Sequence, residues 1–546
     1  MDSASWRIAL GGALIAALAT LPGLGAGTLW DNSETTYGEV AREILLSHDW
    51  VVMHLNGDPW FVQPPLYFWL AALAAKAFGL TEFALRLPSA LATIAAAAVV
   101  GYAVAAVSNV RAALFASVVL STALMQAVIG RLAIMDALLD CAVTVAILAW
   151  FAAIGSGSRR AWYAGWAALG LGTLAKGLVA VAVPLLVIGL WAAWQSRDGR
   201  RTRAPHLVDW LGGVALFVAI VLPWCSALAH AAGVGALGEL AVHYTFGRYV
   251  GTIENQSGPF WYYVPVLILG FFPWFAFLVP ATLAAWREAP ADGEGDLERL
   301  ALVWMIVPLV FFSLAKTKLP NYLALELPAP AILVALWFDS VVERRDRRAA
   351  LWWSALVPLT IGLLALAVAV FSRANRLSAD VAPLQIDLEA LGVVMFVGSA
   401  ACFGLLRVRS AAWLAPFALG ATSIVSMLIV ALVAEPAVER FKPIPQLAAI
   451  IERERRPGDL VGIQSASGGQ GLTFYTRPVV AHLDGPTEVP RSPASDPKRA
   501  VCSAARVFIV TKSDWAHPYP TYGRNRRTLA RSNNDVLYLY DGPPCT

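Results

Sequence analysis

Residues 87–107, LPSALATIAAAAVVGYAVAAV, form an apolar stretch without a single charged side chain. A helix needs about 20 such residues to cross the hydrocarbon core of a bilayer, so this stretch predicts a transmembrane helix. Comparable runs lie near 8–28, 110–129, 134–154, 161–176, 178–195, 207–228, 261–284, 300–315, 322–340, 351–371, 388–406 and 411–433. The sequence therefore predicts an all-α polytopic membrane domain of about 13 transmembrane helices.

The composition agrees with a membrane protein and excludes other classes. The chain is 58% hydrophobic and 14% charged, against about 25% charged residues in soluble proteins. Its mean hydropathy is +0.62. The net charge of +4 is small and the arginines lie in short clusters, which argues against a nucleic-acid partner. The first run lacks a small-residue cleavage signature, so we expect an uncleaved first helix.

The basic residues predict the topology. The short segment 64–79, PPLYFWLAALAAKAFG, is expected to lie in the membrane interface. With that assignment, four basic clusters share one face, which the positive-inside rule makes cytoplasmic; they are Arg159–Arg160, 197–203, 343–348 and 407–409. The opposite face, periplasmic in a bacterial-type chain, then carries the loop 29–86, the loop 229–260, the turn 316–322 and everything after 433.

The tail, 434–546, differs from the rest. Short β-rich pieces such as DLVGIQ (459–464) and RVFIVT (506–511) alternate with turn residues, which predicts a small soluble α/β periplasmic domain. The sequence thus predicts a membrane domain over 1–433 and a soluble domain over 434–546. Cys502 and Cys545 form a disulfide there or stay as two thiols, because connectivity cannot be derived from sequence alone.

Two segments at the predicted periplasmic face carry ionisable side chains. WDNSETTYGEVARE (30–43) holds Asp31, Glu34 and Tyr37, and GRLAIMDALLD (130–140) holds Arg131 and Asp136. Ionisable groups at a membrane boundary are costly to desolvate, so a group of them on one face indicates a functional site. For Asp136 the alternative is a helix-start charge favoured by the macrodipole.

Several segments, in order from about residue 6 to 335, resemble a known family. The segment 30–69, RLAIMDALLD (131–140), GLGTLAKGLVA (170–180), FGRYVGTIENQSGPFWYYVPVLILGFFPW (246–274) and FFSLAKTKLPNYLAL (311–325) are similar to the aminoarabinose transferases that modify lipid A. More broadly they resemble bacterial relatives of the protein mannosyltransferases, in the GT-C class. The resemblance implies an inverting glycosyltransferase that passes a sugar from a polyprenyl-phosphate carrier to an envelope glycolipid, glycan or protein.

The resemblance also implies residue roles. Arg248, Lys318 and Tyr322, with Lys316 as a further candidate, would hold the carrier phosphate, whereas Tyr37, Gln63 and Arg131 would contact sugar or acceptor. Lys176 matches a family lysine. The alternative for these cations is interfacial snorkelling, in which the side chain only anchors a helix end.

The chain departs from the family at two places. The acid generally assigned to catalysis falls on Ser33, with Glu34 retained, and the Glu-Lys before Pro-Pro becomes Val62–Gln63. Three interpretations remain: Asp31 or Glu34 supplies the missing carboxylate, a different donor or acceptor tolerates the loss, or activity is lost. The expected catalytic residues are accordingly Asp31, Glu34 and Asp136.

A divalent metal is possible, with His243 as a weak candidate ligand, although no second His or Cys lies nearby at metal-binding spacing. The competing class is a non-catalytic polyprenyl-phosphate-binding protein or a transporter on the same frame. A transporter usually shows internal repeats and polar interruptions at the bilayer midplane. The polar groups here gather at one face instead, which favours the enzyme.

Overall fold

The structure is a computed structural model of the whole chain. It describes residues 3–30, 33–200, 203, 205–240, 242, 247–251, 257–288, 292–343, 363, 366–367, 370, 385–408, 410–464, 469–476, 480–483, 502–512 and 525–541. These residues divide into two compact units. The first comprises 1–24, 62–67 and 86–434, and the second comprises 25–61, 68–85 and 435–546. The division after 434 coincides with the predicted start of the tail, whereas the grouping of 25–61 with that tail was not predicted.

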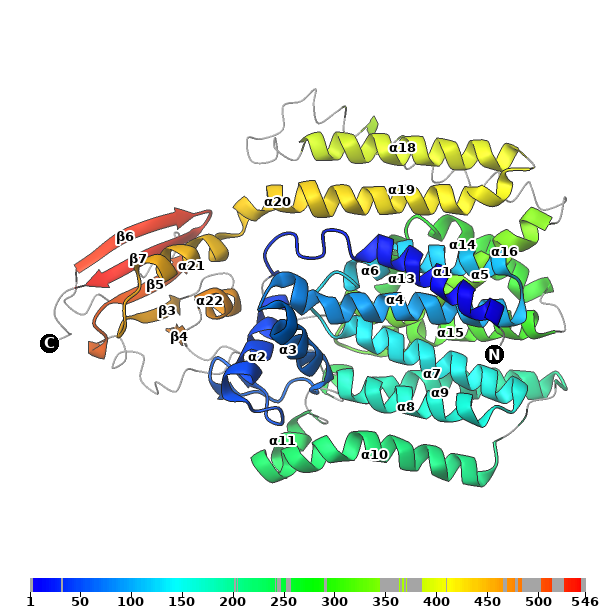
Figure 1. Cartoon of the computed structure of the whole chain (residues 1–546), viewed down its shortest axis with the longest axis horizontal. Coiled ribbons are helices and arrows are strands. Elements are labelled where there is room, and N and C mark those ends of the chain that lie inside the picture. The colour runs from blue at the N-terminus through cyan, green and yellow to red at the C-terminus, as the bar shows by residue number, and fades with distance from the viewer. Residues whose placement is uncertain are drawn as a thin grey trace. The chain divides into compact units, whose positions relative to one another are not determined.

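The first unit is built from helices (Figure 1). They are α1 (Ser3–Thr20), α4 (Glu82–Val107), α5 (Val110–Thr122), α6 (Leu124–Ile129), α7 (Asp136–Ser156), α8 (Arg159–Lys176), α9 (Val179–Arg197), α10 (Leu207–Ala232), α11 (Val234–Gly238), α12 (Gly247–Val250), α13 (Tyr263–Gly270), α14 (Phe275–Glu288), α15 (Gly293–Leu314), η2 (Pro320–Glu326), α16 (Pro328–Glu343), α18 (Gln385–Arg407), η5 (Ala412–Leu414), α19 (Ala415–Ile429) and η6 (Val430–Ala434).

Many of these helices suit a membrane. Among the described residues, 7 helices are long and apolar enough to cross a bilayer, or up to 9 if each of two bent pairs counts as one span. Helices α1, α5 and α8 occupy three further predicted runs, and the predicted run 351–371 lies outside the described residues apart from isolated positions. The chain is therefore a multi-pass membrane protein, of which fewer spans are described than the 13 predicted.

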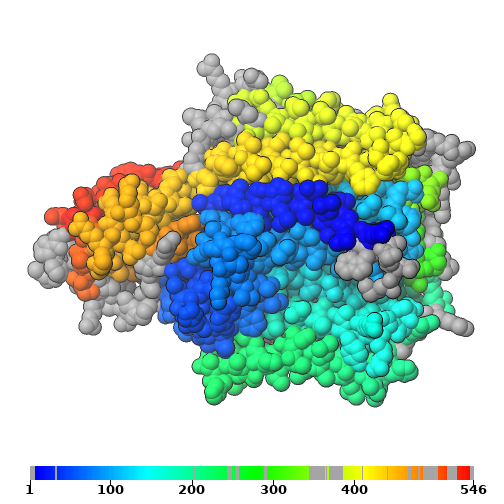
Figure 2. Space-filling model, viewed as in Figure 1, coloured from blue at the N-terminus to red at the C-terminus, as the bar shows by residue number. Residues whose placement is uncertain are grey.

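The surface of the first unit is apolar where a bilayer would cover it. Helix α10 lies at the surface (Figure 2), and its Leu207, Leu211 and Leu222 side chains are exposed. A soluble protein of this size would bury such residues. Inside the unit, helices α7, α8 and α9 pack on one another around the buried Trp150 and Trp166, whose ring centroids lie 5.4 Å apart.

The second unit combines helices with a sheet. Its elements are α2 (Glu34–Ser47), β1 (His54–Leu55), β2 (Asp58–Pro59), α3 (Leu66–Phe78, shared with the first unit), α20 (Glu435–Val438), η7 (Glu439–Phe441), α21 (Pro443–Glu454), β3 (Leu460–Gln464), α22 (Gly469–Thr476), β4 (Val480–His482), β5 (Val507–Lys512), β6 (Asn525–Ser532) and β7 (Asp535–Asp541). The five-stranded sheet has the order β4-β3-β5-β7-β6; β3 is parallel to β4 and β5, whereas β7 is antiparallel to β5 and β6.

The amphipathic helix α21 supplies the core of this unit. Its Ile444, Leu447 and Ile451 are buried against Val461 of β3 and Phe508 of β5. Helix α2, from the amino-terminal third of the sequence, packs on α22. Gly38 permits this approach, because a Cβ there would lie 3.1 Å from the Phe474 ring. An early segment of the chain is thus part of the carboxyl-terminal body.

The described cysteines fall into two groups. Cys141, Cys225 and Cys402 are free thiols, and Cys502 is disulfide-bonded. Cys545 lies outside the described residues, so its pairing with Cys502 stays a prediction.

Candidate active site

Two antiparallel helices bring opposite charges together in the first unit. Helix α7 begins at Asp136 and helix α8 ends at Lys176, so the two side chains meet at the same end of the pair. Each charge suits its own helix terminus, because the macrodipole favours an acid at the start and a base at the end. Gly177 ends α8 with a positive φ of 88°, which favours glycine, and its N–H donates to the Thr173 carbonyl.

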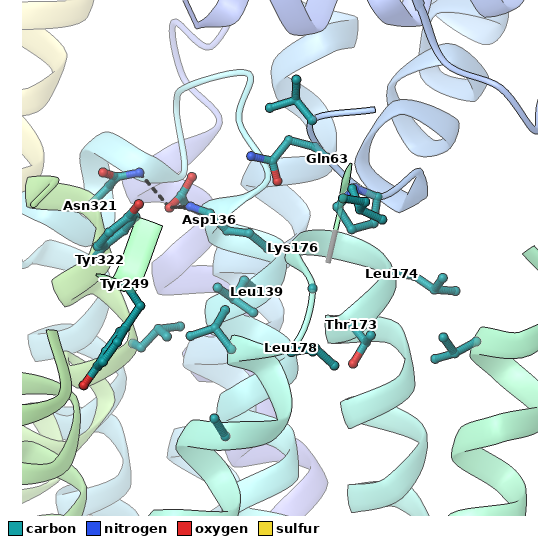
Figure 3. Close-up of a pocket in the computed structure, with 18 of the residues that line it drawn as sticks. Gln63, Asp136, Leu139, Thr173, Leu174, Lys176, Leu178, Tyr249, Asn321 and Tyr322 are labelled. Atoms are coloured by element: carbon teal, nitrogen blue, oxygen red, sulfur yellow. Dashed lines mark hydrogen bonds and ion pairs between the residues drawn. The ribbon is translucent and has the colours of Figure 1, made fainter. Parts of the chain in front are cut away.

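Asp136 is the centre of a polar cluster (Figure 3). Its Oδ1 accepts hydrogen bonds from Lys176 Nζ at 2.5 Å and from Asn321 Nδ2 at 2.7 Å. The side chains of Asp136 and Lys176 are only 7% and 14% exposed. No hydrogen bond from the described residues reaches Oδ2, and Asp136 lines a cavity. This second oxygen is therefore available to accept a hydrogen bond from a ligand.

Tyr322 completes the cluster. The Lys176 ammonium lies 5.3 Å from the centroid of the Tyr322 ring, within the range of a cation–π contact. The Tyr322 ring also packs on Phe312 of α15, with centroids 5.1 Å apart. Pro320 at the start of η2 fixes the turn that presents Asn321 and Tyr322 to the cavity.

The cavity has a volume of about 670 Å³ and combines this polar cluster with a long apolar wall. Gln63 and Thr173 add neutral polar groups. The apolar wall comes from several helices and includes Leu139, Leu174, Leu178, Val179, Ala182, Val221, Trp224, Leu237, Leu240, Phe311 and Phe312. The arrangement suits a ligand with a long hydrocarbon part and a polar head, because the two kinds of surface are continuous.

Backbone contacts join the FGRYVG segment to the KTKLPNY turn. The Lys316 N–H donates to the Tyr249 carbonyl at 3.0 Å, and Thr317 Oγ1 donates to the Gly251 carbonyl at 2.8 Å. Tyr249 itself lines the cavity. Arg248 belongs to α12 and directly precedes Tyr249, but its side chain lies outside what the structure describes, as does His243.

Lys318 lies in the same turn but has a different environment. Its ammonium donates to the carbonyls of Phe312, Ser313 and Ala315 at 3.3, 2.8 and 2.8 Å. An ammonium has three donors, so these contacts use its full capacity. These contacts cap the end of α15, and the contact of Lys318 with the carrier phosphate stays a prediction. The side chain of Lys316 is exposed.

Arg131 is not among the residues that line the cavity. Its guanidinium donates to the carbonyl of Ala19, the penultimate residue of α1, at 3.0 Å. This contact ties the segment before α7 to the first helix. It gives Arg131 a structural contact in addition to the predicted ligand contact, which stays a prediction.

The predicted residues Glu34 and Tyr37 belong to the second unit. The Glu34 carboxylate accepts a hydrogen bond from the Trp30 N–H at 2.9 Å, and its side chain is fully buried. The Tyr37 ring packs on Phe68 and Trp60, with centroids 5.7 and 6.4 Å away. Asp31 lies outside the described residues. Ser33 precedes α2 without capping it through its side chain.

A neighbouring acid has an altered titration. Glu39 in α2 forms two hydrogen bonds with the Arg42 guanidinium, at 2.7 and 2.5 Å. Burial nonetheless raises the pKa of Glu39 to about 7, because desolvation outweighs the attraction of Arg42.

Among the described residues, no group of three or more His, Cys, Asp or Glu side chains could hold a metal ion.

Comparison with known proteins identifies the family of this chain. The family profile of the dolichyl-phosphate-mannose-protein mannosyltransferases matches residues 62–226, a span that includes Gln63, Asp136 and Lys176. The undecaprenyl phosphate-alpha-4-amino-4-deoxy-L-arabinose arabinosyl transferase of Pectobacterium carotovorum is 32% identical over 414 residues, covering 73% of this chain and 71% of the relative. The chain belongs to this arabinosyl transferase family. The transferase of the same name from Pseudomonas paraeruginosa is 32% identical over 406 residues, covering 71% and 69%.

A solved structure agrees with the fold of this transferase. The crystal structure of ArnT from Cupriavidus metallidurans bound to undecaprenyl phosphate superposes with a TM-score of 0.79. It is 23% identical and covers 98% of both chains. The predicted class is thereby confirmed: the chain is a membrane glycosyltransferase that uses a polyprenyl-phosphate-linked sugar.

Sequence reasoning identified part of the polar cluster of this transferase and missed the rest. Four candidates from the sequence line the cavity: Gln63, Asp136, Lys176 and Tyr322. Asn321 was missed, although it lies between two recognised residues of the KTKLPNY turn. Its position next to Tyr322 could have identified it. Both residues lie in the first turn of η2, and Asn321 contacts Asp136 at the start of α7.

Proposed function

We propose that this transferase moves a 4-amino-4-deoxy-L-arabinose unit from undecaprenyl phosphate to lipid A at the periplasmic face of the bacterial inner membrane. The observation that carries the proposal is the cavity in which Asp136, Lys176, Asn321 and Tyr322 end a long apolar wall. A polyprenyl-phosphate sugar has the same division into hydrocarbon and polar head. The names of the relatives supply the sugar and the carrier.

The chemistry is an inverting substitution at the anomeric carbon. The acceptor oxygen bonds to this carbon from the face opposite the leaving group, and the bond to the carrier phosphate breaks, releasing undecaprenyl phosphate. In our proposal Asp136 Oδ2 accepts a hydrogen bond from sugar or acceptor, with Gln63, Tyr37 and Arg131 as further contacts. Arg248 and Tyr322 stabilise the departing phosphate, because charge-assisted hydrogen bonds are the strongest that a phosphate receives.

A phosphate acceptor on lipid A would explain why the enzyme can work with Ser33 in place of the family carboxylate. A phosphate monoester has a second pKa of about 6 and is already ionised at neutral pH. An ionised phosphate oxygen on lipid A needs no base to remove a proton, whereas a hydroxyl acceptor does. We therefore propose a phosphate of lipid A as the nucleophile and Asp31 as the acid that orients the substrate in place of the missing family carboxylate.

The proposal also includes the topology and the domain roles. Thirteen spans, with 64–79 in the interface, would put the basic clusters in the cytoplasm and the acid-bearing segment 30–43 in the periplasm. The carboxyl-terminal α/β domain over 434–546 would then be periplasmic as well. The five-stranded sheet with α21 and α22 supports a domain of that kind.

Mass spectrometry of envelope lipids tests the proposal. Lipid A from cells that express the gene should gain the mass of one or two aminoarabinose units relative to cells that lack it. Purified protein should release undecaprenyl phosphate only when lipid A is present. A modified glycan, glycoprotein or other glycolipid, with lipid A unchanged, would contradict lipid A as the acceptor, and no mass change in any envelope component would contradict transfer itself.

A further inference from the structure

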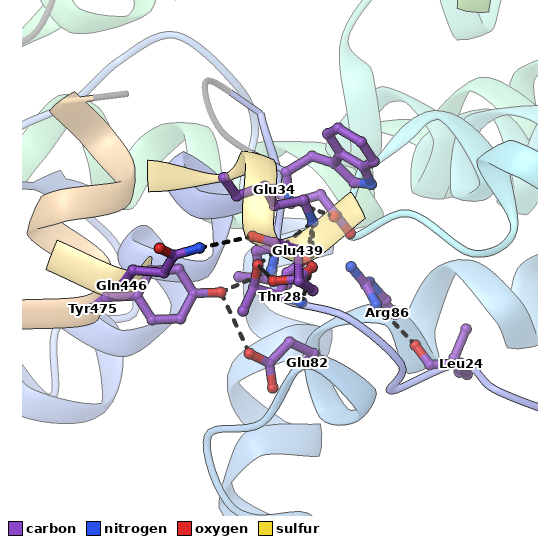
Figure 4. Close-up of polar contacts among 11 residues, drawn as sticks. Leu24, Thr28, Glu34, Glu82, Arg86, Glu439, Gln446 and Tyr475 are labelled. Atoms are coloured by element: carbon purple, nitrogen blue, oxygen red, sulfur yellow. Dashed lines mark hydrogen bonds and ion pairs between the residues drawn. The ribbon is translucent and has the colours of Figure 1, made fainter. Parts of the chain in front are cut away.

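The segment before α2 is held in place by side chains from more than 400 residues later in the chain. The Thr28 N–H donates to Glu439 Oε1 at 2.9 Å, and Thr28 Oγ1 donates to Glu439 Oε2 at 2.7 Å. Both residues belong to the second unit, and Figure 4 shows these contacts. The two carboxylate oxygens of Glu439 thus accept hydrogen bonds from both the backbone and the side chain of Thr28.

Lys442 reinforces this contact. Its ammonium donates to the Thr28 carbonyl at 2.9 Å and to Glu439 Oε1 at 2.8 Å. It also lies 4.2 Å from the centroid of the Trp30 ring. The attraction of Lys442 and the hydrogen bonds from Thr28 outweigh partial burial and lower the pKa of Glu439, which keeps the carboxylate ionised.

Helix α22 contacts the next residue, Leu29, through the Tyr475 hydroxyl. The Leu29 N–H donates to the Tyr475 hydroxyl of α22 at 2.7 Å, and that hydroxyl donates to Glu82 Oε1 at 3.3 Å. The Trp30 N–H donates to the buried Glu34 carboxylate. Three consecutive backbone amides, those of Thr28, Leu29 and Trp30, are therefore satisfied by side chains and not by a helix or a sheet.

Such a conformation depends on those side chains. Residues 28–30 belong to no helix or strand, so no ladder of backbone hydrogen bonds would restore their shape if the side chains were lost. The next residue in the sequence is Asp31, the proposed substitute for the family carboxylate.

We propose that Glu439, Lys442 and Tyr475 are positioning residues for the transfer reaction: the carboxyl-terminal domain fixes the conformation of residues 28–30, which directly precede Asp31. This inference rests on the proposed function for its catalytic part. Misplacing a reacting group by about 1 Å costs on the order of 10²-fold in rate. The rate of transfer should therefore fall although none of the three residues lines the cavity that binds the carrier.

The experiment uses the full-length protein in lipid nanodiscs and follows two readouts. The variants are Glu439→Ala, Tyr475→Phe, Lys442→Met and Lys442→Arg. The control is Arg506→Met, which breaks the ion pair of Arg506 with Asp459, at 2.6 Å, in the same domain and away from the segment. The first readout is hydrogen exchange of the Thr28 and Leu29 amides, and the second is kcat with undecaprenyl-phosphate aminoarabinose and lipid A.

The expected result separates the variants from the control. The Thr28 amide should exchange at least tenfold faster in Glu439→Ala, and the Leu29 amide at least tenfold faster in Tyr475→Phe. We expect kcat to fall about 10²-fold, with affinity for undecaprenyl phosphate within twofold of the native enzyme. Lys442→Arg should recover much of the kcat that Lys442→Met loses, because an arginine preserves the charge and the contact with the Trp30 ring.

Two outcomes would overturn the inference. One is amide exchange that stays unchanged, or that rises as much in Arg506→Met. The other is faster exchange with native kcat. If the native enzyme itself transfers no aminoarabinose to lipid A, the proposed function fails, and the exchange measurement still decides whether the domain holds the segment.

Discussion

Lys176 Nζ lies 2.5 Å from Asp136 Oδ1, although the two residues are 40 positions apart in the sequence. The antiparallel packing of α7 and α8 creates this ion pair at the polar end of the cavity. Asp136 is buried and Lys176 is largely shielded from solvent, so each charge compensates the desolvation of the other and removal of either one is destabilising.

The first prediction follows from this pair. Asp136→Asn or Lys176→Met alone should destabilise the enzyme by about 3–5 kcal/mol, since each leaves one buried charge unpaired. The double variant should recover most of that loss in thermal unfolding while transfer stays lost. Additive destabilisation in the double variant would contradict a coupled pair.

Substitution of the acids before α2 distinguishes Asp31 from Glu34. We expect Asp31→Asn to lower transfer about 10²-fold, because the proposed role of Asp31 is to orient the substrate, and to leave expression and carrier affinity unchanged. Glu34→Gln should reduce transfer less, since the amide oxygen can still accept the hydrogen bond from the Trp30 N–H. Ser33→Asp should change the rate little.

The opposite pattern would contradict this assignment. If Ser33→Asp raises transfer strongly while Asp31→Asn has no effect, the chain lacks its catalytic acid and Asp31 does not replace it. Rates measured with lipid A and with a dephosphorylated acceptor would also show whether a base is needed.

Arg248 is the main candidate for the carrier phosphate. Arg248→Ala should weaken binding of undecaprenyl phosphate by about 1.5–3 kcal/mol, the usual range for a hydrogen bond to a charged group. Arg248→Lys should restore part of the affinity, because lysine keeps the charge but lacks the planar fork. Arg527→Ala, on the exposed strand β6, is the control, and equal effects of the two alanine variants would contradict a specific contact.

Glu39 predicts a dependence of stability on pH. Its pKa is raised from 4.5 to about 7 in the folded protein, so the folded state binds the proton more tightly than the unfolded state. The stability that it contributes is complete below about pH 4.5 and is lost as the pH rises through 7. The pKa of its neighbour Glu43 is also raised by burial and acts in the same direction.

Apparent melting temperatures at pH 5 and pH 8 measure this effect. Glu39→Gln should be more stable than the native enzyme at pH 8 and should flatten the decline between the two pH values. A decline as steep in the variant as in the native enzyme would show that other groups cause it.

Reporter fusions check the topology. Fusions after residues 158 and 345 should report cytoplasm, and fusions after residue 255 and at the carboxyl end should report periplasm. A cytoplasmic carboxyl end would contradict both the count of thirteen spans and the placement of the acid-bearing segment in the periplasm.

The sequence predicted those features that depend on local pattern. Apolar runs of spanning length became helices such as α4, α7 and α9, because hydrophobic length and composition suffice to predict a span. The structure ends α8 at Lys176, the residue that the sequence placed at a helix end. Neither residue alone revealed that Lys176 pairs with Asp136, because that contact depends on how two helices pack.

Features that depend on distant contacts were not predicted. Asn56 illustrates this: its side-chain amide donates to the Val480 carbonyl at 2.9 Å, and its carbonyl oxygen accepts from the Val480 N–H at 2.9 Å. Nothing in the sequence near either residue indicates this pairing, since 424 positions separate them. The same holds for Lys318, whose three carbonyl acceptors become visible only once the end of α15 is in place.

The separation of Thr28 from Glu439, 411 positions along the chain, has a consequence for biosynthesis. The ribosome synthesises residues 28–30 early, yet the side chains of Glu439, Lys442 and Tyr475 that bind them emerge near the end of translation. The nascent chain must therefore reach Glu439 and Tyr475 before residues 28–30 acquire their final conformation. A truncated product that ends before Glu439 would lack these hydrogen-bond partners, so under our proposal incomplete copies would transfer the activated sugar slowly.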